Sequence, residues 1–181
     1  GKTMTWEKVG IDPTAVIGEG CEFGRNAVVE AGTRLGPRCV VGHNAVVHAG
    51  TVLGEGVVVG DNAVVGRQPR PSPTSTVKIG EPLPGLVVGD GSTIGAGAIV
   101  YAGTTVGRQT MIADQAFVRE RCAIGDYVVV GHGVTVENET TIGDYTKIQT
   151  GAYVTAYMTV EDHVFIAPGV YTTNDNFMGR T

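Results

Sequence analysis

Aromatic and charged side chains are both scarce in this sequence of 181 residues. Aromatic residues account for 6% and charged residues for 17%, whereas hydrophobic residues make up 42%. The core must therefore be built from small aliphatic side chains, chiefly valine. The formal net charge of -5 argues against a nucleic-acid-binding surface, which is normally basic.

Long apolar runs are lacking as well. No stretch approaches the roughly 18 consecutive apolar residues that a membrane helix needs, and the first residues do not form a basic, apolar and small-residue leader. Cysteine is limited to three residues, an odd number that suggests a reducing compartment. We therefore expect a soluble cytoplasmic protein that binds neither nucleic acid nor membrane.

Glycine, in contrast, is abundant, at 28 residues, which is about twice the usual share. The reason is an internal repeat. Bulky apolar residues recur at every sixth position from Ile11 to Val65, and again from Val88 to Ile166, without one failure. A helix of 3.6 residues per turn would drift out of phase with such a pattern, so the period favours a different regular structure.

The other positions of each hexad follow rules of their own. The second position is often glycine, and the fifth is small or β-branched. The fourth is glycine or asparagine in most early hexads, as at Gly20, Asn26 and Asn44, and these residues tolerate the left-handed backbone of a sharp corner. Three hexads would make one triangular coil, with the first and fifth positions inward and successive coils stacked at roughly 4.8 Å. This predicts an all-β, parallel β-helix in a single domain, with coils over 11–66 and 88–171.

The hexad [LIV]-G-x-x-[STAV]-x resembles the signature of the hexapeptide-repeat acyltransferases. The resemblance covers nearly the whole chain. It implies a left-handed parallel β-helix and a homotrimer whose active sites form between subunits.

The repeat is interrupted between Val65 and Val88. Residues 67–87 carry five prolines, so they cannot continue the coil and are expected to protrude from a corner. A long loop in a compact domain is usually functional. In hexapeptide transferases such loops reach over the neighbouring subunit and help to wall the active site; the alternative is a disordered excursion.

His132 is the candidate catalytic residue. It lies at the outward third position of its hexad, and in the related sugar acyltransferases of the lipid-A pathway the general-base histidine holds the same position. A base poised near neutrality could accept a proton from an attacking amine or hydroxyl. The alternative is an exposed surface imidazole. His163 falls on a fourth, corner position, which favours a structural role.

The C-terminal stretch resembles the nucleotide-sugar 3-N-acetyltransferases. The matching residues are Lys147, Ile148, Gln149, Glu161, Asp162, Phe165, Pro168, Thr173, Asn174, Asp175 and Arg180. The resemblance implies acetyl-CoA as co-substrate and a nucleotide-linked amino sugar as acceptor. The chain departs from that family at Thr150-Gly151 and Gly179, which leaves the acceptor open. Relatives carry further coils that help to hold coenzyme A. The coenzyme site is therefore incomplete if the protein ends at Thr181, and a truncation after this residue is the alternative.

The substrate-binding candidates are Asn138, Gln149, Asn174, Asp175 and Arg180. Asn138 and Asn174 share one column of outward third positions, two coils apart. Polar groups of this kind can orient the acceptor, and positioning alone supplies much of a transfer rate.

Two other interpretations stay open. His43 and His48 resemble the paired histidines of γ-class carbonic anhydrases, but Glu7 stands where the third ligand would lie, so we predict no metal site. A non-catalytic β-helix scaffold is the second alternative. Cys21, Cys39 and Cys122 all fall on inward fifth positions; Cys21 and Cys39 are close enough for a disulfide, and we expect reduced core thiols.

Overall fold

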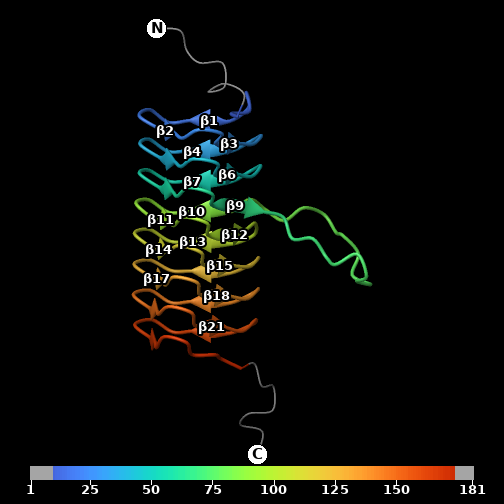
Figure 1. The fold of residues 1–181 in the computed structure, drawn as a ribbon, viewed down its shortest axis with the longest axis vertical. Coiled ribbons are helices and arrows are strands. Elements are labelled where there is room, and N and C mark those ends of the chain that lie inside the picture. The colour runs from blue at the N-terminus through green and yellow to red at the C-terminus, as the bar shows by residue number, and fades with distance from the viewer. Residues whose placement is uncertain (1–9, 174–181) are drawn as a thin grey trace, which may run out of the picture.

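The computed structural model describes residues 10–173 as one column of coils made of short parallel strands (Figure 1). Each coil contributes three strands, one to each side of the column, except the last described coil, which contributes two. In order they are β1 (Val16–Ile17), β2 (Glu22–Phe23), β3 (Val28–Val29), β4 (Arg34–Leu35), β5 (Val40–Val41), β6 (Val46–Val47), β7 (Val52–Leu53), β8 (Val58–Val59), β9 (Val64–Arg67), β10 (Val87–Val88), β11 (Thr93–Ile94), β12 (Ile99–Tyr101), β13 (Thr105–Val106), β14 (Met111–Ile112), β15 (Phe117–Val118), β16 (Ala123–Ile124), β17 (Val129–Val130), β18 (Thr135–Val136), β19 (Thr141–Ile142), β20 (Lys147–Ile148), β21 (Tyr153–Val154), β22 (Thr159–Val160) and β23 (Phe165–Ile166).

The strands form three parallel sheets. Sheet 1 runs β1-β4-β7-β10-β13-β16-β19-β22, sheet 2 runs β2-β5-β8-β11-β14-β17-β20-β23, and sheet 3 runs β3-β6-β9-β12-β15-β18-β21. Each strand pairs with its equivalent one coil later, as in the register Val129↔Lys147. The backbone ladder is regular, with Gly143 N–H donating to the Val160 carbonyl at 2.7 Å. The predicted parallel β-helix of hexapeptide repeats is confirmed.

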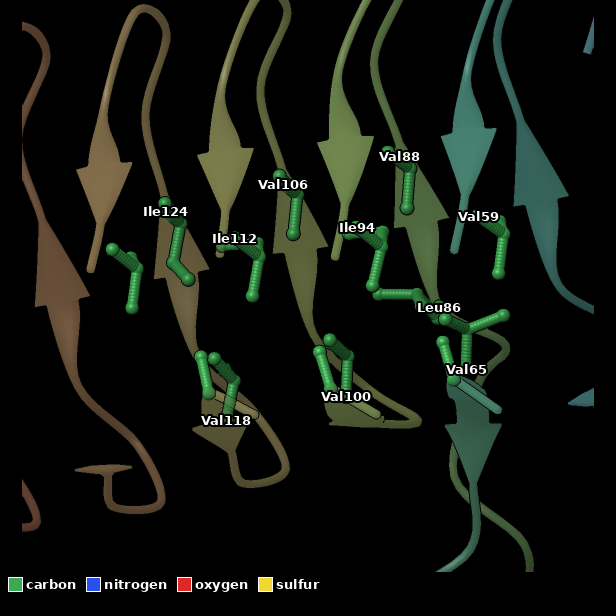
Figure 2. Close-up of a cluster of buried hydrophobic side chains, with 14 of the residues drawn as sticks. Val59, Val65, Leu86, Val88, Ile94, Val100, Val106, Ile112, Val118 and Ile124 are labelled. Atoms are coloured by element: carbon green, nitrogen blue, oxygen red, sulfur yellow. The ribbon is translucent and has the colours of Figure 1, made fainter. Parts of the chain in front are cut away.

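The interior is filled by the first and fifth positions, as predicted. Figure 2 shows ten of these side chains in columns between the sheets: Val59, Val65, Leu86, Val88, Ile94, Val100, Val106, Ile112, Val118 and Ile124. Burying one such side chain contributes about 1.5–3 kcal/mol. No single residue therefore dominates the core, and stability is spread along the column.

From Gly20 to Gly169, the fourth position of each hexad outside the arm adopts the left-handed conformation. The prediction rested on Gly and Asn, but bulky residues follow the same rule, with φ of 55° at Tyr127 and 58° at Tyr145. A side chain in this region costs of order 1–3 kcal/mol. The neighbouring coils compensate: Tyr145 N–H, for example, donates to the Asp126 carbonyl at 3.0 Å.

The predicted loop protrudes from the column between β9 and β10 (Figure 1). Its last residues rejoin the coil before the repeat pattern indicates, because Leu86 is fully buried and its carbonyl accepts a hydrogen bond from Val52 N–H at 2.8 Å. Leu86 occupies an inward fifth position, where the other hexads, apart from the one with Met158, carry small or β-branched residues. Because leucine does not fit the usual fifth-position pattern, the sequence did not indicate that the coil resumes at Leu86.

The three cysteines point inward as predicted, and each is a free thiol. Each donates a hydrogen bond to a backbone carbonyl one coil on, at 3.2 Å for Cys21, 3.0 Å for Cys39 and 3.1 Å for Cys122. Residues 10–173 contain no helix long and apolar enough to cross a membrane.

Candidate functional site

Every coil turns at three corners, which differ in chemistry. The ladder corner follows sheet 1 and comprises 18–20, 36–38, 54–56, 89–91, 107–109, 125–127, 143–145 and 161–163. The histidine corner follows sheet 2 and comprises 24–26, 42–44, 60–62, 95–97, 113–115, 131–133, 149–151 and 167–169. The loop corner follows sheet 3 and comprises 12–14, 30–32, 48–50, 66–85, 101–103, 119–121, 137–139 and 155–157.

The ladder corner is held by aspartates that bond one coil to the next. Asp144 Oδ1 accepts the backbone N–H of Asp126 at 2.8 Å, and Asp162 Oδ1 accepts that of Asp144 at 2.7 Å. Each carboxylate fills the space that a side chain at the second position would need, so a Cβ on Gly125 or Gly143 would collide with it. Glycine recurs at the second position because the coils approach closely there.

An aromatic stack completes the ladder corner. The rings of Tyr127 and Tyr145 stack at 5.0 Å between centroids with 6° between planes, and those of Tyr145 and His163 at 5.0 Å and 1°. The guanidinium of Arg108 lies 5.6 Å from the Tyr127 ring centroid. His163 is thus a member of a structural stack at a left-handed corner, in agreement with its predicted role.

His132 lies on the histidine corner with its side chain exposed. Its Nε2 is 3.2 Å from Gln115 Oε1, so in the tautomer that donates to this oxygen Nδ1 keeps a free lone pair. Gln149 lies on the same corner one coil on and is half-buried. The Gly151 N–H donates to the His132 carbonyl at 3.0 Å and fixes the backbone between them. The structure therefore brings two of the predicted site residues together.

The two histidines of the zinc alternative lie on different corners. His43 Nδ1, on the histidine corner, accepts the Arg25 backbone N–H at 2.7 Å. His48, on the loop corner, pairs through Nδ1 with Glu30 Oε1 at 2.5 Å. Within residues 10–173, no three His, Cys, Asp or Glu side chains are grouped so that they could hold a metal ion. Glu7 lies outside the described residues.

The loop has a fixed root at the loop corner. The Gln68 amide both donates to the Leu83 carbonyl and accepts the Leu83 N–H, each at 2.9 Å. The next residue toward the column, Pro84, is held as well: its carbonyl accepts a hydrogen bond from Gly103 N–H of the next coil at 2.7 Å. Beyond this root, residues 72–82 are all exposed. The loop is thus an arm whose base is bonded to the column.

A charged cluster lies beneath the root. Arg119 donates from Nε and Nη2 to the two carboxylate oxygens of Glu120, at 2.8 and 3.1 Å, and Glu120 is 8% exposed. The Arg119 guanidinium also lies 4.6 Å from the Tyr101 ring centroid, and Arg67 lies 5.8 Å from the same centroid. Hydrogen bonding to Glu120 raises the pKa of Arg119. This arginine is therefore a fixed charge with its partner in place.

The sequence patterns did not single out this cluster. A signal was nevertheless present, because the second position of the loop corner is Tyr101, Arg119 and Glu137 in three successive coils, where the other corners mostly carry glycine. Without an aspartate from the next coil in that space, large side chains fit. Glu137 accepts a hydrogen bond from the Tyr153 hydroxyl at 3.1 Å; burial and then this carboxylate raise the pKa of Tyr153.

A cavity of about 790 Å³ opens between the arm and the loop corner. Asn138, a predicted substrate-binding residue, lines it together with Tyr157 and the arm residues Arg70 and Lys78. Ligand pockets typically measure 300–1,000 Å³. The cavity is therefore large enough for a small organic molecule.

The predicted site residues thus fall into separate groups. His132 and Gln149 share the histidine corner, whereas Asn138 lies at the loop corner, beyond β18 in the same coil as His132. Asn174, Asp175 and Arg180 lie outside the described residues. One chain presents two candidate regions, a histidine region and a loop cavity.

Solved structures with a similar fold are UDP-N-acetylglucosamine acyltransferases. The enzyme from Francisella novicida has 23% identity and a TM-score of 0.83 over 91% of this chain and 61% of its own. That from Bacteroides fragilis has 23% identity and a TM-score of 0.84 over 91% and 65%, and that from Campylobacter jejuni 25% and 0.51 over 91% and 68%. The chain thus spans less than two thirds of the first two proteins. No curated protein sequence matches it.

Two family models match the repeats. The bacterial transferase hexapeptide (six repeats) matches residues 14–49, 32–67 and 121–156. The hexapeptide repeat of succinyl-transferase matches residues 85–113. Together these ranges cover more than half of the sequence, on both sides of the arm. The chain belongs to the hexapeptide-repeat family of bacterial transferases.

Proposed function

We propose that this chain is an acetyl-CoA-dependent N-acetyltransferase acting on a nucleotide-linked amino sugar, with His132 as the general base. The observation that carries the proposal is the state of His132, which is exposed and bonded to a side chain through Nε2 only. Membership of a transferase family supports the reaction class. The C-terminal resemblance to nucleotide-sugar 3-N-acetyltransferases supports the donor and acceptor.

In the proposed reaction, the neutral sugar amine attacks the thioester carbonyl and forms a C–N bond. Nδ1 of His132 accepts the proton that the amine loses. The tetrahedral intermediate collapses, the C–S bond breaks, and the proton is passed to the leaving thiolate. Gln115 orients the imidazole as a positioning residue, because its carboxamide oxygen selects the tautomer with Nδ1 free.

Gln149 is proposed to hold the acceptor beside His132, because both lie on the histidine corner in adjacent coils. Asn138, Asn174, Asp175 and Arg180 are proposed to bind the remainder of the substrate. Orientation of this kind can replace a strong base, since effective concentrations of well-placed groups are very high.

A homotrimer is proposed as the working form. Apolar side chains on the outer face of sheet 2 support association: Val58 is 36%, Met111 46% and Phe165 64% exposed. Exposed apolar patches on soluble proteins commonly mark interfaces. A molecular mass in solution equal to one chain would contradict this assembly.

The test measures thiol release from acetyl-CoA against a panel of amino-sugar nucleotides. The His132→Ala variant should lose about 10²–10⁴-fold in kcat, the usual contribution of a general base. The matched control is His163→Tyr, which should keep full activity. Tyrosine already holds the equivalent position of the aromatic stack in the two preceding coils, at Tyr127 and Tyr145. Absence of turnover with every acceptor, or an unchanged kcat in His132→Ala, would refute the proposal.

A hydroxyl acceptor is the second candidate. UDP-N-acetylglucosamine is named as the substrate of the similar Campylobacter jejuni enzyme, at 25% identity. The same panel should therefore include this compound. Product that stays stable to mild base would indicate an amide rather than an ester.

A further inference from the structure

The loop corner changes character where the arm leaves it. In the two coils before the arm and in the coil just after it, the third and fourth positions of the loop corner are small: Ala31-Gly32, Ala49-Gly50 and Ala102-Gly103. In the next three coils they are Glu120-Arg121, Asn138-Glu139 and Ala156-Tyr157. The cavity lies at this change, below the arm. The repeat alone does not require any of the larger residues, since small ones turn the same corner elsewhere.

The charged groups of the cavity divide into paired and unpaired sets. Glu120 is bonded to Arg119, and Glu139 Oε1 lies 3.4 Å from Arg121 Nη1. Among residues 10–173, by contrast, no ion pair or side-chain hydrogen bond engages Arg70, Lys78, Glu81 or the Asn138 carboxamide, all of which line the cavity. The paired residues build the wall of the cavity, and the unpaired ones are available to a ligand.

We propose that this cavity binds a nucleoside diphosphate. Arg70 and Lys78 supply two positive charges without partners, against one unpaired carboxylate, that of Glu81, so the unpaired groups carry a net positive charge. Such cationic side chains are the usual partners of phosphate oxygens. The ring of Tyr157 is 64% exposed and offers a surface on which a base can stack. Asn138 offers both a donor and an acceptor to the polar edge of that base.

The apolar part of the cavity fits the rest of such a ligand. Val77 and Ile79 on the arm line it and are 68% and 79% exposed. An apolar wall beside two cations matches a molecule that has a flat heterocycle at one end and a diphosphate at the other. A simple inorganic anion would use the cations alone and leave Tyr157 and Asn138 without a role.

Two molecules of the proposed reaction contain this chemistry, namely the nucleotide of the acceptor and the adenosine diphosphate part of coenzyme A. The inference rests on the proposed function for this choice of ligands. Binding to the cavity is nevertheless separate from catalysis at His132, because the two lie on different corners. UDP and coenzyme A are therefore the two probes that distinguish the sources.

The experiment is titration calorimetry of the purified chain with UDP and, separately, with coenzyme A. The double variant Arg70→Met/Lys78→Met should weaken binding of the true ligand tenfold or more, and Tyr157→Leu should weaken it severalfold. The matched control is Arg34→Met, an exposed arginine on β4 outside the cavity, which should change the dissociation constant less than twofold. Because the arm residues are exposed, the double variant should keep the wild-type melting temperature.

The outcomes separate the inference from the proposed function. UDP binding that depends on the arm cations assigns the cavity to the acceptor, and coenzyme A binding with the same dependence assigns it to the donor; either supports the inference. Wild-type chain that binds neither probe, or binding unaffected by both cavity variants, overturns it even if the chain acetylates a sugar. Dependent UDP binding without any turnover would leave the cavity assigned and the proposed reaction refuted.

Discussion

The ladder corner and the loop corner bend the backbone in the same way but carry opposite patterns of side chains. At the ladder corner, Asp144 and Asp162 repeat one chemical role coil after coil, each bonded to the backbone of the coil before. At the loop corner, the equivalent position changes from Ala102 to Glu120 and then Asn138. Repetition marks what the column needs for stacking, whereas its loss marks residues free to serve another purpose.

The difference also explains where glycine is required. At the ladder corner the second position is filled by the next aspartate, so Gly125 has no room for a side chain. At the loop corner the second position accommodates Arg119 and Glu137. A substitution that is harmful at one corner should therefore be harmless at the other.

The largest expected effect follows from placing a side chain at Gly125. Gly125→Val should lower the free energy of unfolding by about 2–4 kcal/mol, through overpacking against Asp144 and loss of its hydrogen bond to Asp126. The measurement is urea denaturation. Thr155→Val is the matched control, because it places the same valine at the same hexad position of the loop corner, where a β-branched residue of equal size already fits. Equal losses in both variants would remove the distinction between the corners.

A smaller loss of stability is expected from substitutions at the third hexad position of the ladder corner. Asp144→Ala removes the acceptor of a 2.8 Å hydrogen bond and should cost about 1–2 kcal/mol of unfolding free energy. Asn138→Ala, at the same position of the loop corner, should change stability by less than about 0.5 kcal/mol, because its carboxamide supports no neighbour. If Asn138→Ala proves as destabilising as Asp144→Ala, the loop corner is structural after all.

The smallest effect concerns the inward side of the loop corner. Burial raises the pKa of the Cys122 thiol to about 11. The unfolded chain releases this proton from about pH 9, so stability is full below that pH and is lost as pH rises through the folded pKa. The expected loss is about 1 kcal/mol at pH 10. Denaturation of wild type and Cys122→Ala between pH 8 and 10 measures it; parallel pH profiles would contradict the prediction.

The fold followed from the sequence because its requirements repeat. Every sixth residue from Ile11 to Val65 faces the same environment, so each further coil repeats the same apolar residue type and strengthens the prediction. The corner at His163 was predictable for the same reason. The point at which the arm returns to the coil was not predictable, since Leu86 is a large residue at a hexad position that mostly carries small or β-branched ones.

The candidate site could be anticipated only in part. The hexad phase placed His132 outward, and the structure adds its partner Gln115, which no periodicity could reveal because the pairing depends on side-chain conformations. The Arg119–Glu120 pair and the cavity are set by how the arm folds over the corner. Features that occur once, such as this ion pair and this cavity, produce no periodic pattern in the sequence. The one indication of them was that Arg119 stands at a hexad position where the other corners mostly carry glycine.

The closed root of the arm has a consequence for variation. Because Gln68 and Leu83 join the two sides of the arm at its base, the coils above and below stay in register, with Val65 paired to Val100. Residues 69–82 can then be lengthened, shortened or exchanged without disturbing that register. The column thus provides a graft point, at which recognition can diversify while the scaffold is inherited unchanged.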